Sequence, residues 1–201
     1  MAVLIVVVAL IVLIGLFVWA SYNGLVSLKN KIDNGWAQID VQLKRRHDLI
    51  PNLVETVKGY AAHESGTLEA VVKARNSAIQ ATGTAEQAQA ENAITGALKS
   101  IFALAEAYPD LKANQNFLNL QEELTGTEGR IAYARQFFND VVTQYNTKIQ
   151  KFPSNIIAGR LGFTRHDYFE IDDATDRENV NVSFGTGGTT PPAAPPSAPT
   201  A

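Results

Sequence analysis

Residues 2–20 read AVLIVVVALIVLIGLFVWA, a run without a charge or a strong hydrogen-bonding side chain. At about 1.5 Å per residue, 19 helical residues span about 28 Å, close to the thickness of a bilayer's hydrocarbon core. The alternative is a cleavable signal peptide, since Val18-Trp19-Ala20 weakly resembles a cleavage site. No Lys or Arg precedes the run, and the run is longer than a usual signal-peptide core. These two features favour a retained transmembrane helix.

The charges that follow this run predict its orientation. Lys29 and Lys31 lie close to its downstream end, whereas the upstream flank has no Lys or Arg. Positive residues favour the cytoplasmic side, so we expect a single-pass protein of the inner membrane, with its N-terminus outside and its C-terminal domain in the cytoplasm. Trp19 and Tyr22 stand where aromatic side chains line a membrane interface.

The helix is expected to continue beyond the membrane. No Pro occurs before Pro51, and apolar positions recur every three or four residues from Leu25 to Ala61. This seam comprises Leu25, Leu28, Ile32, Trp36, Ile39, Leu43, His47, Ile50, Val54, Val57 and Ala61. One helix from Ala2 to about Tyr60 would measure roughly 90 Å.

Three further helices are predicted, two shorter and one long. The first begins near Ser65 and ends at Thr82-Gly83, and the second begins with Thr84 and Gln87 as a capping box and ends at Tyr108-Pro109. The long one carries a 3,4 spacing of apolar residues from Phe117 to Ile149 and ends at Phe152-Pro153. The expected fold is all-α: a transmembrane helix that continues into an antiparallel bundle of about four helices, two long and two shorter.

Within the long helix, Gly126 and Gly129 are expected to mark a close approach to another helix. After the bundle, an apolar extension with Phe163, Tyr168, Phe169 and Ile171 is expected to fold back on it. The expected divisions are residues 1–21 for the membrane helix, 22–171 for the bundle and extension, and 172–201 for a disordered tail. That tail is acidic at first and then rich in Gly, Pro, Ala and Thr.

Composition excludes several kinds of site. The chain has no Cys, so thiol catalysis and thiolate metal sites are excluded, and a net charge of -3 gives no basic footprint for nucleic acid. His63-Glu64 resembles the start of a zinc motif, but Thr67 stands where the second His is required. His166 has no partner at ligand spacing. We therefore expect no metal, no cofactor and no nucleic-acid partner.

The densest polar cluster is 44–48, KRRHD, within an otherwise regular helix. Pro51 removes the hydrogen bond to the carbonyl of His47, so a kink is expected there. His47, with Arg46 or Asp48 beside it, is then either a proton-sensing or ligand-binding group or a satisfied core histidine, and the second interpretation is favoured.

A second pair of charges lies in the long helix. Glu128 and Arg135 are seven residues apart and therefore share a face. They form either a buried pair across helices or an ordinary pair at the edge of the seam, and the edge pair is favoured because burying such a pair rarely stabilises.

The sequence closely resembles the LemA family. The most specific stretch is 36–53, WAQIDVQLKRRHDLIPNL, and shorter matches lie at Tyr22-Asn23, Gly59-Tyr60, His63-Glu64, Thr127-Glu128, Tyr145-Asn146 and 152–155. The resemblance covers residues from Tyr22 to about Glu170 and leaves out the tail. It implies an antiparallel bundle of long helices, an N-terminal membrane helix with its N-terminus outside, a cytoplasmic domain and a bacterial source. It implies no catalytic residues.

Two functions are expected from these features. The first is a membrane-anchored scaffold or assembly protein of the bacterial envelope, which binds copies of itself or other envelope proteins through helical faces. The second is a sensor or ligand-binding adaptor that switches at the element of Arg46, His47, Asp48 and Pro51. An enzyme is the least favoured, because no nucleophile lies beside a positioned base.

Overall fold

The computed structural model describes residues 1–170, and these residues form helices joined by short connections. The helices are α1 (Ala2–Lys58), α2 (Ser65–Gln80), α3 (Thr84–Glu106), α4 (Pro109–Lys112), α5 (Gln115–Gln150) and α6 (Ser154–Arg160). Ile171 and the tail 172–201 lie outside the described residues, so the expected boundary before the tail remains a prediction. The all-α fold with two long and two shorter helices is confirmed.

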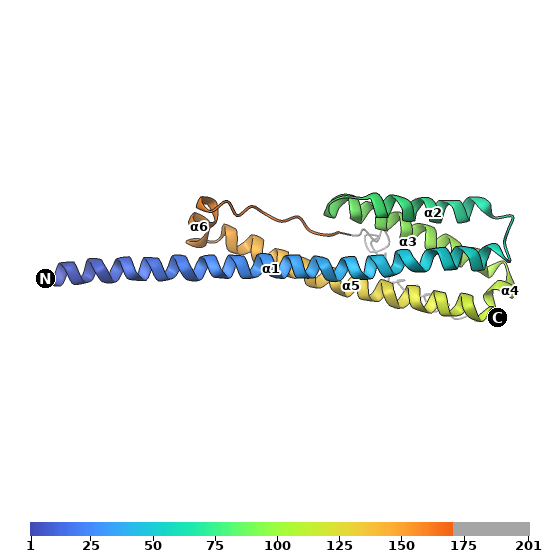
Figure 1. Cartoon of the computed structure of the whole chain (residues 1–201), viewed down its shortest axis with the longest axis horizontal. Helices are drawn as coiled ribbons and strands as arrows, with labels where there is room; N and C mark the ends of the chain where they lie inside the picture. Colours follow the sequence, from blue (N-terminus) through green and yellow to red (C-terminus); the bar gives the residue numbers. More distant parts are fainter. Residues whose placement is uncertain (171–201) are drawn as a thin grey trace, which may run out of the picture.

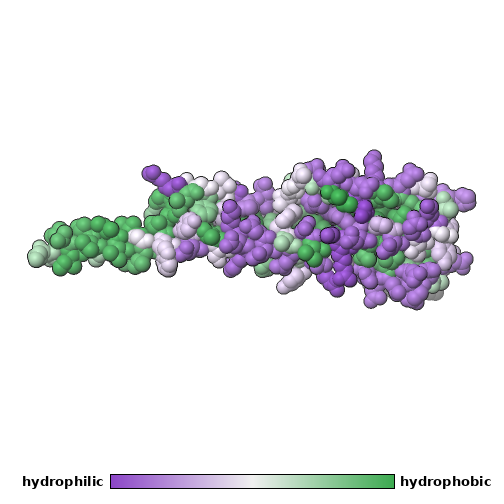
Figure 2. Space-filling view, in the orientation of Figure 1, coloured by the Kyte–Doolittle hydropathy of each residue, from purple (hydrophilic) through white to green (hydrophobic). Residues whose placement is uncertain are grey.

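The first helix, α1, is one element of 57 residues. Residues 1–20 are exposed, and burial begins at Ser21, where the bundle starts. Among residues 1–170, α1 is the one helix long and apolar enough to cross a membrane. Figure 1 shows it projecting beyond the other helices, and Figure 2 shows that the projecting part is hydrophobic. Membrane segment and bundle are therefore parts of a single rod.

The seam of α1 packs on α5, which runs antiparallel beside it (Figure 1). Leu25, Ile32, Ile39, Leu43, Ile50 and Val57 are buried as the spacing predicted. The hairpin of α2 and α3 covers one flank of this pair at the end away from the projecting helix. The hairpin does not cover the half of that flank nearer the projecting helix.

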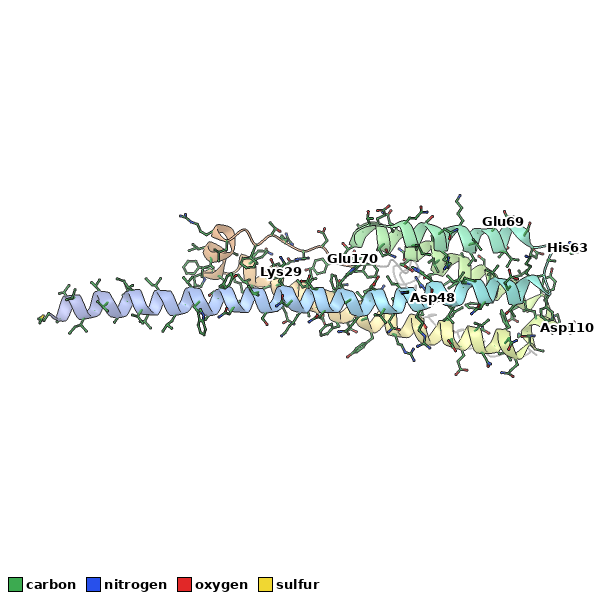
Figure 3. All side chains as sticks on the ribbon, viewed as in Figure 1. Lys29, Asp48, His63, Glu69, Asp110 and Glu170 are labelled. Atoms are coloured by element: carbon green, nitrogen blue, oxygen red, sulfur yellow. The ribbon has the colours of Figure 1, made fainter. Side chains whose placement is uncertain are left out.

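The extension, residues 163–170, fills that half, as predicted (Figure 1). Phe169 is fully buried, and the centre of its ring lies 5.3 Å from the centre of the Trp36 ring. The ring centres of Phe163 and Tyr22 are 6.1 Å apart. Figure 3 places Glu170, at its end, near the hairpin.

Two asparagines of α5 hold the backbone of the extension. The Asn139 amide accepts from the N–H of Phe169 (2.9 Å) and donates to its carbonyl (3.1 Å). Asn146 does the same for His166, at 3.0 and 2.9 Å. From Asn139 to Asn146 the helix rises about 10.5 Å over seven residues, and from His166 to Phe169 the extended chain covers about 10 Å over three. The two spacings therefore match.

Two local expectations are wrong. Gly83 caps α3, with no side-chain cap from Thr84, and Gln87 instead donates to Glu91 and to the carbonyl of Ala78. No atom lies within 4 Å of a Cβ built at Gly126 or Gly129, so these glycines do not mark a close helix approach.

The open surroundings of these two glycines give a stability prediction. We expect Gly126→Ala and Gly129→Ala each to raise the free energy of unfolding by up to about 1 kcal/mol, because Ala favours the helix and meets no clash. Chemical denaturation in detergent, followed by circular dichroism, measures this. Gly83→Ala is the control: φ at Gly83 is 81°, so this change should destabilise, and a loss at Gly126 or Gly129 would contradict the prediction.

Candidate functional site

A layer of polar side chains crosses the bundle between two apolar clusters. One cluster contains Leu43, Ala88 and Ile131, and the other contains Ile50, Ile94 and Leu124. The polar layer (Arg46, His47, Glu91 and Glu128) stands between them on α1, α3 and α5. It is therefore a cross-section of the bundle rather than a surface patch.

Arg46 is the centre of this layer and is fully buried. Its Nη2 bonds the Glu91 carboxylate and also donates to the Glu91 carbonyl (3.3 Å). Its Nη1 donates to Glu128 (2.5 Å) and to the hydroxyl of Thr95 (3.2 Å). The Nε atom has no partner among the described residues. One guanidinium thus links α1 to both α3 and α5.

Glu91 is the other fully buried charge. Besides Arg46, it accepts from Gln87 (2.7 Å) and lies 2.8 Å from Nε2 of His47. A carboxylate can only accept, so His47 carries a proton on Nε2 in this arrangement. Burial raises the pKa of Glu91, but the hydrogen bond from His47 and the charge and hydrogen bond of Arg46 outweigh it and lower the pKa.

This lowered pKa predicts a loss of stability in acid. A group whose pKa is lower in the folded state stabilises above its unfolded pKa, near 4.5, and the contribution disappears as the pH falls through the folded value. We expect the free energy of unfolding to fall below about pH 4.5, and to fall less in Glu91→Gln. Denaturation curves at several pH values measure this, and equal acid slopes in both proteins would contradict it.

Pro51 acts on the same layer without interrupting the helix. The carbonyl of His47 accepts from Nε of Arg75 on α2 (2.7 Å), which replaces the hydrogen bond that Pro51 cannot give. Pro51 lies inside α1, which continues past it to Lys58 without a break. The freed carbonyl instead joins α2 to α1.

The other predicted site residues lie around the layer. Asp48 is exposed on α1 (Figure 3) and lines a cleft of about 380 Å³ together with His47 and with Arg75 of α2. Glu128 of α5 bonds Arg46 of α1, a contact between helices. Arg135 lies two turns further along α5 and is half-buried. Trp19 and Tyr22 are exposed where α1 leaves the bundle. Of the residues that sequence reasoning proposed, Arg46, His47 and Glu128 lie in the polar layer.

Sequence reasoning missed Glu91, the residue that joins Arg46 to His47. A signal was present: Glu91 stands three residues before Ile94, in register with the apolar face Ile94, Leu98, Ile101 and Ala105. A charged residue at a seam position requires a buried partner, and Arg46 supplies it.

The layer pairs buried charges across three helices. In residues 1–170 no group of three or more His, Asp or Glu side chains could hold a metal ion. A hydrogen-bonded layer of buried charges in a helical bundle fixes the register of its helices, because any slip leaves those charges unpaired.

A second candidate feature is an open groove between α1 and α5. It measures about 610 Å³ and is lined by Ala37, Gln38, Val41, Gln42, Gly126, Gly129, Arg130, Tyr133 and Ala134. Tyr133 is 75% exposed and Val41 is 62% exposed at its edges. The opposite flank of α5 holds other parts of the chain: Glu128 bonds α1, and Asn139 and Asn146 bond the extension. These three residues are spaced by nearly whole helical turns, so they lie on one face of α5.

Comparison with known proteins gives consistent matches. Residues 35–184 match the LemA family. The chain is 29% identical over 164 residues to protein LemA of Metamycoplasma hominis, covering 80% of this chain and 72% of that protein. It is 26% identical over 181 residues to magnetosome protein MamQ 1 of Paramagnetospirillum magneticum and 25% identical to MamQ of Magnetospirillum gryphiswaldense. These last two matches each cover 77% of this chain and 66% of the relative.

Proposed function

Because the chain belongs to the LemA family and is a membrane-anchored helical protein, we propose that it is a scaffold that assembles with copies of itself in the membrane. The proposed site is the bacterial inner membrane, with the bundle in the cytoplasm. Lys29 and Lys31, which closely follow the apolar run, support this orientation. The proposal assigns no catalytic reaction and no cofactor.

The groove between α1 and α5 is the observation that carries the proposal. Large exposed side chains, Tyr133 and Val41, stand beside a floor of Ala37, Gly126 and Gly129. A surface that contains both a protruding and a hollow part can pair with itself, which is what a two-fold interface requires.

The membrane favours this pairing. The continuous α1 holds the groove at a fixed height above the bilayer, so the grooves of two copies meet at the same level. Confinement to one plane also raises the effective concentration of the copies. A weak groove contact is sufficient under these conditions.

Crosslinking in membranes tests the proposal. The chain has no Cys, so Tyr133→Cys introduces a single reactive group in the groove, and Asn76→Cys on the exposed side of α2 is the control. We expect dimers from Tyr133→Cys and few from Asn76→Cys. Monomers alone from Tyr133→Cys, at full labelling of the thiol, would refute assembly through the groove.

A sensor is the second candidate, and one observation favours it: Glu91 is shared by Arg46 and His47, and His47 borders the cleft of Asp48 and Arg75. A second proton on the His47 ring would add a positive charge to the polar layer. His47→Gln keeps a hydrogen-bond donor without that charge. Crosslinking through Tyr133→Cys is compared at several pH values with His47 intact and with His47→Gln added. If it varies with pH only when His47 is intact, the layer acts as a switch, and identical pH profiles would exclude a switch.

A further inference from the structure

The membrane-proximal end of the bundle exposes large apolar side chains outside α1. Phe152 is 80% exposed, Ile156 is 58% exposed and Leu161 is 52% exposed. All three belong to residues 152–161, here called the foot, which consists of α6 and its two flanking turns. Ile157 and Ala158 of the same segment are buried against the bundle, so the foot presents an outer apolar face. Isolated aromatic and aliphatic side chains of this size gain by leaving water.

The foot lies at the height where α1 enters the membrane. The end of the Lys148 side chain lies against Gly24, and Phe163 packs on Tyr22, so α5 and the extension reach this level from both sides of the foot. Because α5 runs antiparallel to α1 and ends at Gln150, the foot begins just beyond it, at the end of the bundle from which α1 projects (Figure 1). Figure 1 places α6 at this end, and Figure 2 shows that the hydrophobic surface of α1 continues onto it.

Basic residues predominate at this end, and Asp33, Asp140 and Asp167 mark where acidic residues begin. Residues 2–32 and 141–166 contain no Asp or Glu, although the whole chain has a net charge of -3. They contain six basic residues: Lys29, Lys31, Lys148, Lys151, Arg160 and Arg165. Figure 3 shows Lys29 at this end and Asp110 and Glu69 at or toward the opposite end. Basic residues beside an exposed apolar face are the features of a segment that lies in the surface of an anionic membrane.

We propose that the foot is a second membrane contact, which lies in the interfacial layer beside α1. Phe152, Ile156 and Leu161 insert among the outer parts of the acyl chains. Lys151 and Arg160, which flank them, contact anionic headgroups. The foot then fixes the tilt and rotation of the bundle relative to the bilayer, which a single helix cannot do. This contact is independent of self-association, because the foot and the groove share no residue.

The test uses the full chain, reconstituted in vesicles of phosphatidylcholine alone or mixed with phosphatidylglycerol. An environment-sensitive fluorophore is attached to Ile156→Cys, and to Leu118→Cys as the control. Leu118 is also an exposed apolar residue, at 41%, but it stands at the other end of α5. We expect a blue-shifted emission at position 156 that brominated lipid quenches and iodide does not, and the reverse at position 118.

Two results would overturn the proposal. A label at position 156 that iodide quenches as strongly as at 118 places the foot in water. A label that is protected from both quenchers places it against protein. The charge contribution has its own test: in mixed vesicles, Lys151→Gln and Arg160→Gln should each shift the equilibrium from inserted to free by about fivefold. Equal lipid quenching in both vesicle types and both variants would refute the part of the proposal that involves anionic headgroups.

Discussion

Replacing Glu91 with Ala is expected to lower the free energy of unfolding by about 3–5 kcal/mol. The change leaves the guanidinium of Arg46, which is fully buried, without its closest counter-charge, and it also removes the acceptor of His47 and Gln87. Glu128 stays bonded to Arg46 but is partly exposed, so the guanidinium loses its one fully buried counter-charge, which costs far more than a lost surface pair. Denaturant titration of the detergent-solubilised full chain, followed by circular dichroism, measures the change.

The matched control is Glu123→Ala. Glu123 pairs with Arg45, the neighbour of Arg46, at 3.6 Å, and both side chains are 51% exposed. An exposed pair contributes about 0–1 kcal/mol, so this variant should be nearly as stable as the wild type. Similar effects of the two substitutions would contradict the role given to the polar layer.

Replacing Phe138 with Ala is the second large effect, an expected loss of about 3–5 kcal/mol. Phe138 is 1% exposed, and its ring lies 5.7 Å from that of Trp36 and against Gly35. The truncation leaves a cavity at the point where α1, α5 and the extension meet, because Trp36 also contacts Phe169. The same denaturant titration measures the loss.

Phe137→Ala is the control at the adjacent position. Phe137 is 41% exposed, so its truncation removes less buried surface and should cost about 1 kcal/mol or less. If Phe137→Ala proved as damaging as Phe138→Ala, the α1–α5 seam would have a different register from the one described.

The helices of this protein were predictable from sequence because their signals are local. The apolar run 2–20, the seam from Leu25 to Ala61 and the spacing in α5 each follow from the helical period alone. The docking of Phe163 and Phe169 was also predictable, since large apolar side chains in a short extension bury themselves where they can.

The partners across helices were not predictable in the same way. Arg46 meets Glu91 at a separation of 45 residues and Glu128 at 82, and no local pattern relates these positions. Asn139 and Asn146 form their pairs with the extension only after the chain has folded back on α5. The pairs then require the spacing of the two asparagines along the helix to match the spacing of Phe169 and His166 along the extension. Gly126 and Gly129 look like close-packing residues in sequence, but the groove beside them is open in residues 1–170.

Assembly through the groove can be tested by counting the copies that associate in a membrane. Full-length protein with one fluorophore per chain is reconstituted at low density, and single-molecule bleaching steps are counted for wild type and for Gly129→Arg. The variant should fold, since no atom lies within 4 Å of a Cβ at Gly129. We expect two or more steps for wild type and single steps for Gly129→Arg. Single steps for wild type, or multiple steps that persist in the variant, would contradict it.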